Sequence, residues 1–139
     1  MYTNMEFNKL KQAVKDVLPQ VVSCQRLNKT VQKHHVVRLV EMLLMNNYFS
    51  FNGKLYHQTI GASMGAIPSP EICDIHLHQI LEHLIKNSPH KNKIITHVRF
   101  TDDGFMIWEN ATKEDITNFF HTANNFHHLL KFTNLLSKQ

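Results

Sequence analysis

The sequence predicts an α+β fold in which antiparallel hairpins alternate with amphipathic helices. Two dipeptides that favour tight hairpins, Asn52-Gly53 and Asp103-Gly104, each lie between short segments rich in aromatic and β-branched residues. Other segments carry apolar residues at the spacing of one helix face. The expected order is helix, helix, hairpin, helix, hairpin, helix, strand. It lacks the strand–helix–strand repeat that builds a parallel sheet.

Composition indicates a globular chain. The 139 residues suffice for one domain with a modest core, which we expect to span 1–139. Hydrophobic residues make up 42% and charged residues 19%, which excludes a disordered polyelectrolyte. The net charge of +4 is compatible with nucleic-acid binding but does not require it. No apolar run is long enough to span a membrane and no signal peptide is recognisable, so we expect an intracellular protein without a membrane partner.

The first two helices are predicted from apolar periodicity. The first covers Glu6 to Leu18, with Asn4 as its N-cap and Pro19 as its end. The second runs from about Thr30 to Asn46. Its expected buried stripe consists of Val36, Leu39, Val40, Leu43 and Leu44.

The Asn-Gly hairpin comes next. Its strands are predicted at Tyr48 to Phe51 and at Lys54 to Ile60, followed by an irregular Gly- and Pro-containing segment up to Pro70. A long helix is predicted from Ser69 to Lys86, with Ser69 as its cap and Pro70 in its first turn.

The second hairpin is predicted within His97 to Trp108, with Asp103-Gly104 as its turn. Val98 and Phe100 should share one face. A capped helix follows from Thr112, with Asp115 three residues on, and ends between Phe126 and His128. Residues 129–133 are predicted to form a short strand.

Asp102 and Asp103 are the candidate metal ligands. Two adjacent ionised carboxylates repel each other, and a divalent cation relieves that repulsion. Oxygen ligands suit Mg²⁺. An ordinary solvated Asp-Asp-Gly turn is the commoner explanation of this tetrapeptide taken alone.

Three segments taken together resemble the reverse transcriptases of Penelope-like retroelements. Asn47 to Glu82 resembles that family's hairpin followed by Gln-x-x-Gly-x-x-Met-Gly-x-x-x-Ser-Pro and a long palm helix. Arg99-Phe100-Thr101-Asp102-Asp103 is similar to the Arg-Tyr-x-Asp-Asp box. Asn124 to Thr133 is similar to a later palm segment ending in Lys-Phe-Thr. The order and spacing of the segments match as well as their content.

The resemblance implies a polymerase palm-like antiparallel sheet, built from hairpins and packed against about three or four helices. It implies RNA-directed DNA synthesis by two-metal nucleotidyl transfer with Mg²⁺ or Mn²⁺, acting on an RNA template, a DNA primer and deoxynucleotides. Asp102 and Asp103 would be the catalytic, metal-binding pair. The nucleotide- and template-binding candidates are Tyr2, Gln58, Gly61, Gly65, Ser69 and Lys131.

Two departures from the family pattern matter. The family's first catalytic Asp would lie four residues before Met1, while Tyr2 matches the residue under the nucleotide sugar. After Thr133 the match ends, so fingers, thumb and the first palm strand are not matched. We therefore expect a partial palm that is inactive alone and that self-associates through a bared sheet edge. Such an enzyme would work in the nucleus, whereas the alternative is a non-catalytic nucleic-acid-binding or interaction module.

Three aromatic residues of the second hairpin allow two interpretations. Phe100, Phe105 and Trp108 have the ring systems that stack on bases, but aromatics on strands more often belong to a core.

Overall fold

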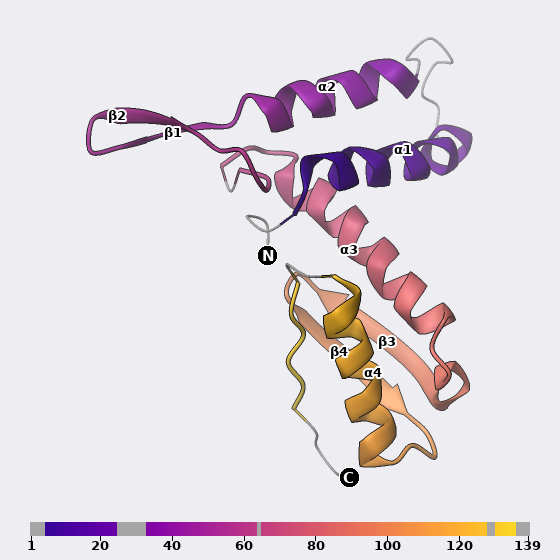
Figure 1. The fold of residues 1–139 in the computed structure, drawn as a ribbon. Helices are drawn as coiled ribbons and strands as arrows, with labels where there is room; N and C mark the ends of the chain where they lie inside the picture. The colour runs from indigo at the N-terminus through magenta and orange to yellow at the C-terminus, as the bar shows by residue number, and fades with distance from the viewer. Residues whose placement is uncertain (1–4, 25–32, 64, 128–129, 136–139) are drawn as a thin grey trace. The chain divides into compact units, whose positions relative to one another are not determined.

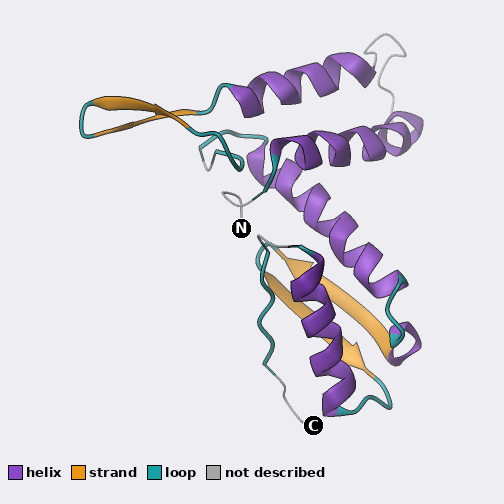
Figure 2. Cartoon of the chain, viewed as in Figure 1, coloured by secondary structure: helices purple, strands orange, loops and turns teal. Residues whose placement is uncertain are grey.

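The computed structural model describes residues 5–24, 33–63, 65–127 and 130–135 (Figure 1). These ranges contain four α-helices and two separate two-stranded antiparallel sheets, which confirms the α+β class (Figure 2). The chain divides into two compact units, unit 1 (residues 1–79) and unit 2 (residues 80–139), and the boundary between them lies inside helix α3 (Ser69–Lys86). Among the described helices, none combines the length and apolarity needed to cross a membrane.

Helix α1 (Phe7–Cys24) continues past Pro19, so the prediction that proline ends this helix was wrong. Proline removes one backbone hydrogen bond, but its fixed φ is already helical. The turns that precede it are held by burial, which allows the helix to continue. The buried side chains of this face are Leu10, Ala13, Val14 and Leu18.

Helix α2 (Lys33–Met45) lies beside α1 (Figure 1). The Lys11 ammonium of α1 lies 2.9 Å from the Glu41 carboxylate of α2. The predicted stripe is only partly buried. Val40 and Leu44 are buried, whereas Leu39 is 60% and Leu43 44% exposed. Its predicted start at about residue 30 lies outside the described residues.

The first hairpin forms where Asn52-Gly53 predicted it. Strands β1 (Tyr48–Phe51) and β2 (Lys54–His57) pair antiparallel, and Asn52 and Gly53 both have positive φ, 49° and 71°. Positive φ at both turn positions matches the right-handed strand twist. Strand β2 ends at His57 rather than at Ile60. Every residue of both strands is exposed.

An irregular segment leads from β2 into α3 (Ser69–Lys86), as predicted. Gly61 has a φ of 80°, which glycine adopts without steric cost, and its N–H donates to the Met5 carbonyl at 2.9 Å. Ser69 is the first helical residue and is buried. Pro70 lies in the first turn, where proline is tolerated.

The second hairpin has its turn two residues earlier than predicted. Strands β3 (Ile94–Phe100) and β4 (Asp103–Trp108) pair antiparallel, with Phe100 opposite Asp103 and Arg99 opposite Gly104. The turn residues are therefore Thr101 and Asp102, and the Asp103-Gly104 assignment was wrong. A shift of two residues leaves every side chain on its expected face. At the end of the hairpin away from the turn, the Glu109 N–H donates a hydrogen bond to the Lys93 carbonyl at 2.8 Å.

The two faces of this hairpin differ. Trp108 is half-buried and meets Phe119 of α4 edge to face, with 5.4 Å between ring centroids. The core interpretation is therefore confirmed for Trp108 but wrong for Phe100 and Phe105, which are 79% and 60% exposed. The exposed apolar side chains of β3 and β4 are Ile95, Val98, Phe100, Phe105 and Ile107.

Helix α4 (Lys113–Phe126) begins and ends as predicted. Thr112 is its N-cap, and a full capping box with Asp115 is present. The predicted strand over 129–133 is wrong for the described residues 130–133, which form no strand. Instead, the Asn124 amide of α4 donates to the Phe132 carbonyl at 3.0 Å and accepts from its N–H at 2.6 Å. These are the backbone groups that a strand would offer to a ladder.

Candidate metal-binding and nucleotide-binding residues

The Asp102-Asp103 pair occupies the tip of the second hairpin. Asp102 is the second turn residue, and Asp103 is the first residue of β4. Both are exposed, and no described residue donates a hydrogen bond or forms an ion pair with either carboxylate. Four carboxylate oxygens are therefore open to solvent and to an incoming cation.

The backbone beneath this pair is constrained. Thr101 has a φ of 49°, in the left-handed region that β-branched residues rarely adopt. The Arg99 guanidinium donates to the Thr101 carbonyl at 2.8 Å. Gly104 lies opposite Arg99 in the register of the two strands. Arg99 thus supports the backbone that carries Asp102.

The donor chemistry of the pair suits Mg²⁺, which binds hard oxygen ligands and often uses one or two carboxylates with water and substrate phosphates. The described residues contain no group of three or more His, Cys, Asp or Glu side chains that could hold a metal ion. A two-ion centre needs a further ligand.

Gln58 and Gly61 belong to the loop that follows β2. The Gln58 amide donates to the Ile60 carbonyl at 2.8 Å and to the Ala62 carbonyl at 3.5 Å. These bonds shape the backbone around Gly61, which is itself buried. In the described structure, both residues serve the conformation of this loop.

Three other predicted residues have different surroundings. Ser69 is buried, whereas Gly65 is exposed and a Cβ built on it would meet nothing within 4 Å. The Lys131 ammonium donates to the Asn124 carbonyl at 2.9 Å, where a cation stabilises the C-terminal end of α4. Tyr2 lies outside the described residues.

The predicted site residues fall in both units. Gln58, Gly61, Gly65 and Ser69 belong to unit 1, and Asp102, Asp103 and Lys131 belong to unit 2.

Comparison of the chain with protein-family models, curated proteins and solved structures found no match. The likeness to a reverse transcriptase palm therefore rests on the residues and spacing of the three segments.

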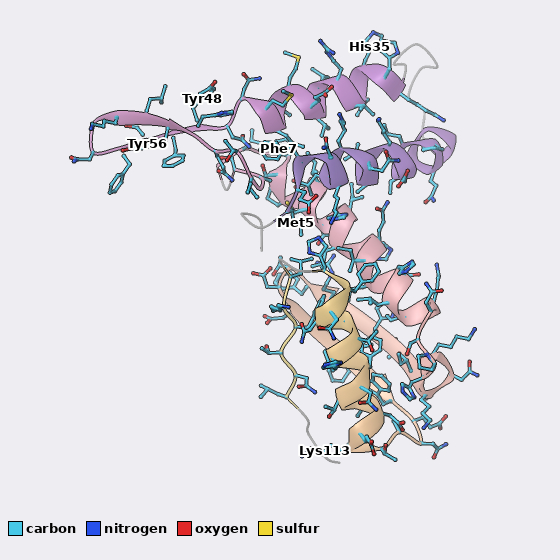
Figure 3. The ribbon with its side chains drawn as sticks, viewed as in Figure 1. Met5, Phe7, His35, Tyr48, Tyr56 and Lys113 are labelled. Atoms are coloured by element: carbon cyan, nitrogen blue, oxygen red, sulfur yellow. The ribbon has the colours of Figure 1, made fainter. Side chains whose placement is uncertain are left out.

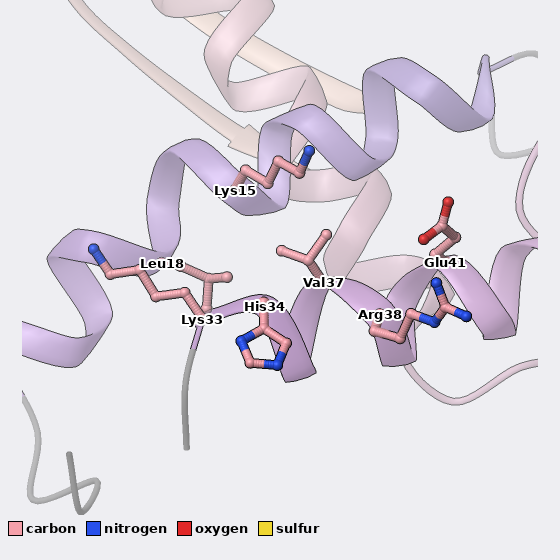
Figure 4. A pocket seen from close by; sticks show the side chains of 7 residues that line it. All are labelled: Lys15, Leu18, Lys33, His34, Val37, Arg38 and Glu41. Carbon is pink, nitrogen blue, oxygen red and sulfur yellow. The ribbon is translucent and has the colours of Figure 1, made fainter. Parts of the chain in front are cut away.

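Sequence reasoning missed a cavity of about 510 Å³ between α1 and α2 (Figure 4). Its apolar lining is Leu18 and Val37. Its polar lining consists of Lys15, Lys33, His34, Arg38 and Glu41. The available signal was the number of basic residues around 33–38 together with Lys11 and Lys15, which are four residues apart on α1.

The acidic residue of this lining is already engaged. The Lys11 hydrogen bond and charge hold the pKa of Glu41 below its usual value, and the charges of Arg38 and Lys15 add to this effect. In contrast, Lys15, Lys33 and Arg38 form no ion pair or hydrogen bond with another described residue. The cavity therefore carries an excess of positive charge.

Proposed function

We propose that this chain carries a palm segment of an RNA-directed DNA polymerase, of the kind found in Penelope-like reverse transcriptases. In this proposal Asp102 and Asp103 bind the catalytic Mg²⁺ or Mn²⁺. The observation that supports it is the Arg99–Asp103 turn. It presents two adjacent, exposed carboxylates, neither of which is engaged by a described residue, at the tip of an antiparallel hairpin.

The residues of the turn would act as follows. Asp102 and Asp103 would ligate the cation, and Arg99 would keep the turn in place through the Thr101 carbonyl. Bound metal ions stabilise the attacking and leaving oxygens in nucleotidyl transfer. Since two carboxylates provide only part of a two-ion centre, we expect the 139 residues to bind a divalent cation without catalysing synthesis by themselves.

Manganese titration of ¹⁵N-labelled protein tests the metal site, because Mn²⁺ broadens the NMR signals of nearby nuclei. We expect the strongest broadening at Thr101 to Gly104, and its loss in Asp102→Asn/Asp103→Asn. The control Glu109→Gln/Glu114→Gln removes two exposed carboxylates of the same unit and should leave the broadening unchanged. Equal broadening in native protein and in the Asn variant would refute the site.

Primer extension tests the catalytic expectation. Purified protein would be incubated with an RNA template, a labelled DNA primer, deoxynucleotides and Mg²⁺ or Mn²⁺. No templated product is expected. Templated synthesis that disappears in the Asp102→Asn/Asp103→Asn variant would contradict the expected inactivity and establish the polymerase.

A second candidate is a non-catalytic nucleic-acid-binding module. It is favoured by the β1–β2 hairpin, whose aromatic residues are exposed and which lies in a stretch, 42–70, without any acidic residue. Tyr48 and Tyr56 project from this hairpin in Figure 3. Stacked ring pairs, Tyr48 with His57 and Phe49 with Tyr56, provide flat surfaces of the kind on which bases stack.

Filter binding of an RNA–DNA duplex separates the two candidates. Duplex binding that requires Mg²⁺ and is weakened by Asp102→Ala supports the polymerase palm. Duplex binding that needs no Mg²⁺ and survives this substitution supports the binding module. In that case, the slope of log affinity against log salt gives the number of phosphate contacts.

A further inference from the structure

We propose that the cavity between α1 and α2 binds the phosphate and the attached sugar or base of a nucleotide. The cavity lies wholly in unit 1. It is therefore independent of the carboxylate pair of unit 2, and this proposal stands or falls separately from the metal site.

The first argument for this proposal is the positive charge of the residues that line the cavity. Lys15, Lys33 and Arg38 line the cavity and have no ion-pair partner among the described residues. The acidic residue of the lining, Glu41, is paired with Lys11 at 2.9 Å and is also attracted by the charges of Arg38 and Lys15, so the lining keeps a net positive charge. Like charges around one cavity repel each other, and an anion relieves that repulsion. A phosphate suits this set because a guanidinium such as that of Arg38 can donate two parallel hydrogen bonds to its oxygens.

The second argument comes from the basic residues in the first described turn of α2. This turn contains Lys33, His34 and His35 and no acidic residue. A bound anion would offset the lysine charge there.

The apolar residues of the lining favour a ligand that carries a sugar or a base in addition to its phosphate. Leu18 of α1 and Val37 of α2 line the same cavity, and Val37 lies between the basic side chains in Figure 4. A volume of about 510 Å³ falls within the range of small-molecule sites. Inorganic phosphate would leave these apolar side chains unused, whereas a nucleotide would cover them with its sugar or base.

Fluorescence anisotropy in EDTA tests the proposal, since no divalent cation is required. Two probes are used: a fluorescein-labelled single-stranded oligonucleotide and a methylanthraniloyl-labelled deoxynucleoside triphosphate. The cavity variant is Lys33→Gln/Arg38→Gln. The control, Lys9→Gln/Lys113→Gln, changes the net charge equally at residues that do not line the cavity.

We expect the cavity variant to weaken binding by roughly tenfold or more and the control by less than about twofold. For the oligonucleotide, the slope of log affinity against log salt should fall by roughly 0.7 for each lost phosphate contact. Arg38→Lys, which keeps the charge but not the planar fork, should lose less than Arg38→Gln. Circular dichroism melting of each variant verifies that the fold is retained.

The two probes also identify the source of the nucleotide. Cavity-dependent binding of both probes indicates that free nucleotides are accepted, and binding of the oligonucleotide alone indicates a nucleic-acid strand. Equal losses in the cavity and control variants would show attraction by net charge only and would overturn the proposal. Failure of native protein to bind either probe would also overturn it.

Discussion

The Lys93 ammonium lies 2.7 Å from Oδ2 of Asp115, at the junction between the second hairpin and α4. The same carboxylate oxygen accepts the Thr112 backbone N–H at 2.8 Å and so completes the capping box. His90 Nδ1 lies 3.4 Å from the other oxygen. One carboxylate thus connects the residue before β3 to the first turn of α4, and it aligns these two elements of unit 2.

Acid should weaken unit 2 through Asp115. The Lys93 hydrogen bond, followed by that of the Thr112 backbone, holds the pKa of Asp115 well below the ordinary aspartate value of 3.8. The stability from this lowered pKa is fully present above the unfolded value and is lost as pH falls through the folded pKa. The free energy of unfolding of native protein should therefore fall steeply between about pH 4 and pH 2.

Asp115→Asn should be less stable than native protein at neutral pH. Its free energy of unfolding should also depend less on pH in the acid range than that of native protein. Urea unfolding of both proteins from about pH 5 down to pH 2 measures it. Asp16→Asn, an exposed carboxyl in α1, serves as a control and should retain the slope. The same slope in Asp115→Asn as in native protein would contradict the assignment.

Thr101→Gly should stabilise the protein, because Thr101 has a φ of 49° and glycine adopts this conformation without a clash between Cβ and the backbone. We expect a gain of about 1 kcal/mol in the free energy of unfolding. Thr96→Gly, in the exposed and extended part of β3, should instead lose stability. Chemical denaturation of both variants measures the difference, and a loss in Thr101→Gly would show that this turn has no strain to relieve.

Pro19→Ala should stabilise α1. Pro19 is exposed and lies inside the helix, where it cannot donate to the carbonyl of the preceding turn. Alanine restores that hydrogen bond, and we expect a gain of about 1–3 kcal/mol. Urea denaturation followed by circular dichroism at 222 nm measures it. Gln20→Ala is the neighbouring control. An unchanged or lower stability of Pro19→Ala would mean that the helix does not continue past this residue in solution.

The second hairpin should drive self-association, which the sequence predicted from a bared sheet edge. Strands β3 and β4 have no further strand paired to them among the described residues. Val98 lies opposite Phe105, and both are 60% exposed. We expect sedimentation velocity to show concentration-dependent dimers that Val98→Thr/Phe105→Thr shifts to monomers.

The control for self-association uses two other exposed apolar residues. Ile67 and Leu135 are 91% and 101% exposed and lie outside the strands. Ile67→Thr/Leu135→Thr should leave the dimers in place. A monomeric native protein at the highest attainable concentration would refute the prediction.

Local signals in the sequence were sufficient for several elements. Asn52-Gly53 predicted its hairpin because both turn positions require positive φ, which these two residues tolerate. Thr112 and Asp115 predicted the start of α4 because their side chains satisfy backbone N–H groups within the same turn. Each of these features depends on residues only a few positions apart, so no knowledge of the remaining chain was needed.

Other features depended on contacts between distant residues. The turn at Thr101-Asp102 belongs to a register that also includes the Glu109–Lys93 hydrogen bond at the other end of the hairpin. Residues 130–133 do not form a strand because Asn124 takes the Phe132 backbone groups. The cationic cavity needs α1 beside α2. The sequence by itself determined the helices, the hairpins and the candidate carboxylates. Only the tertiary structure decided the register, the exposed faces and the cavity, because these arise from side chains far apart along the chain.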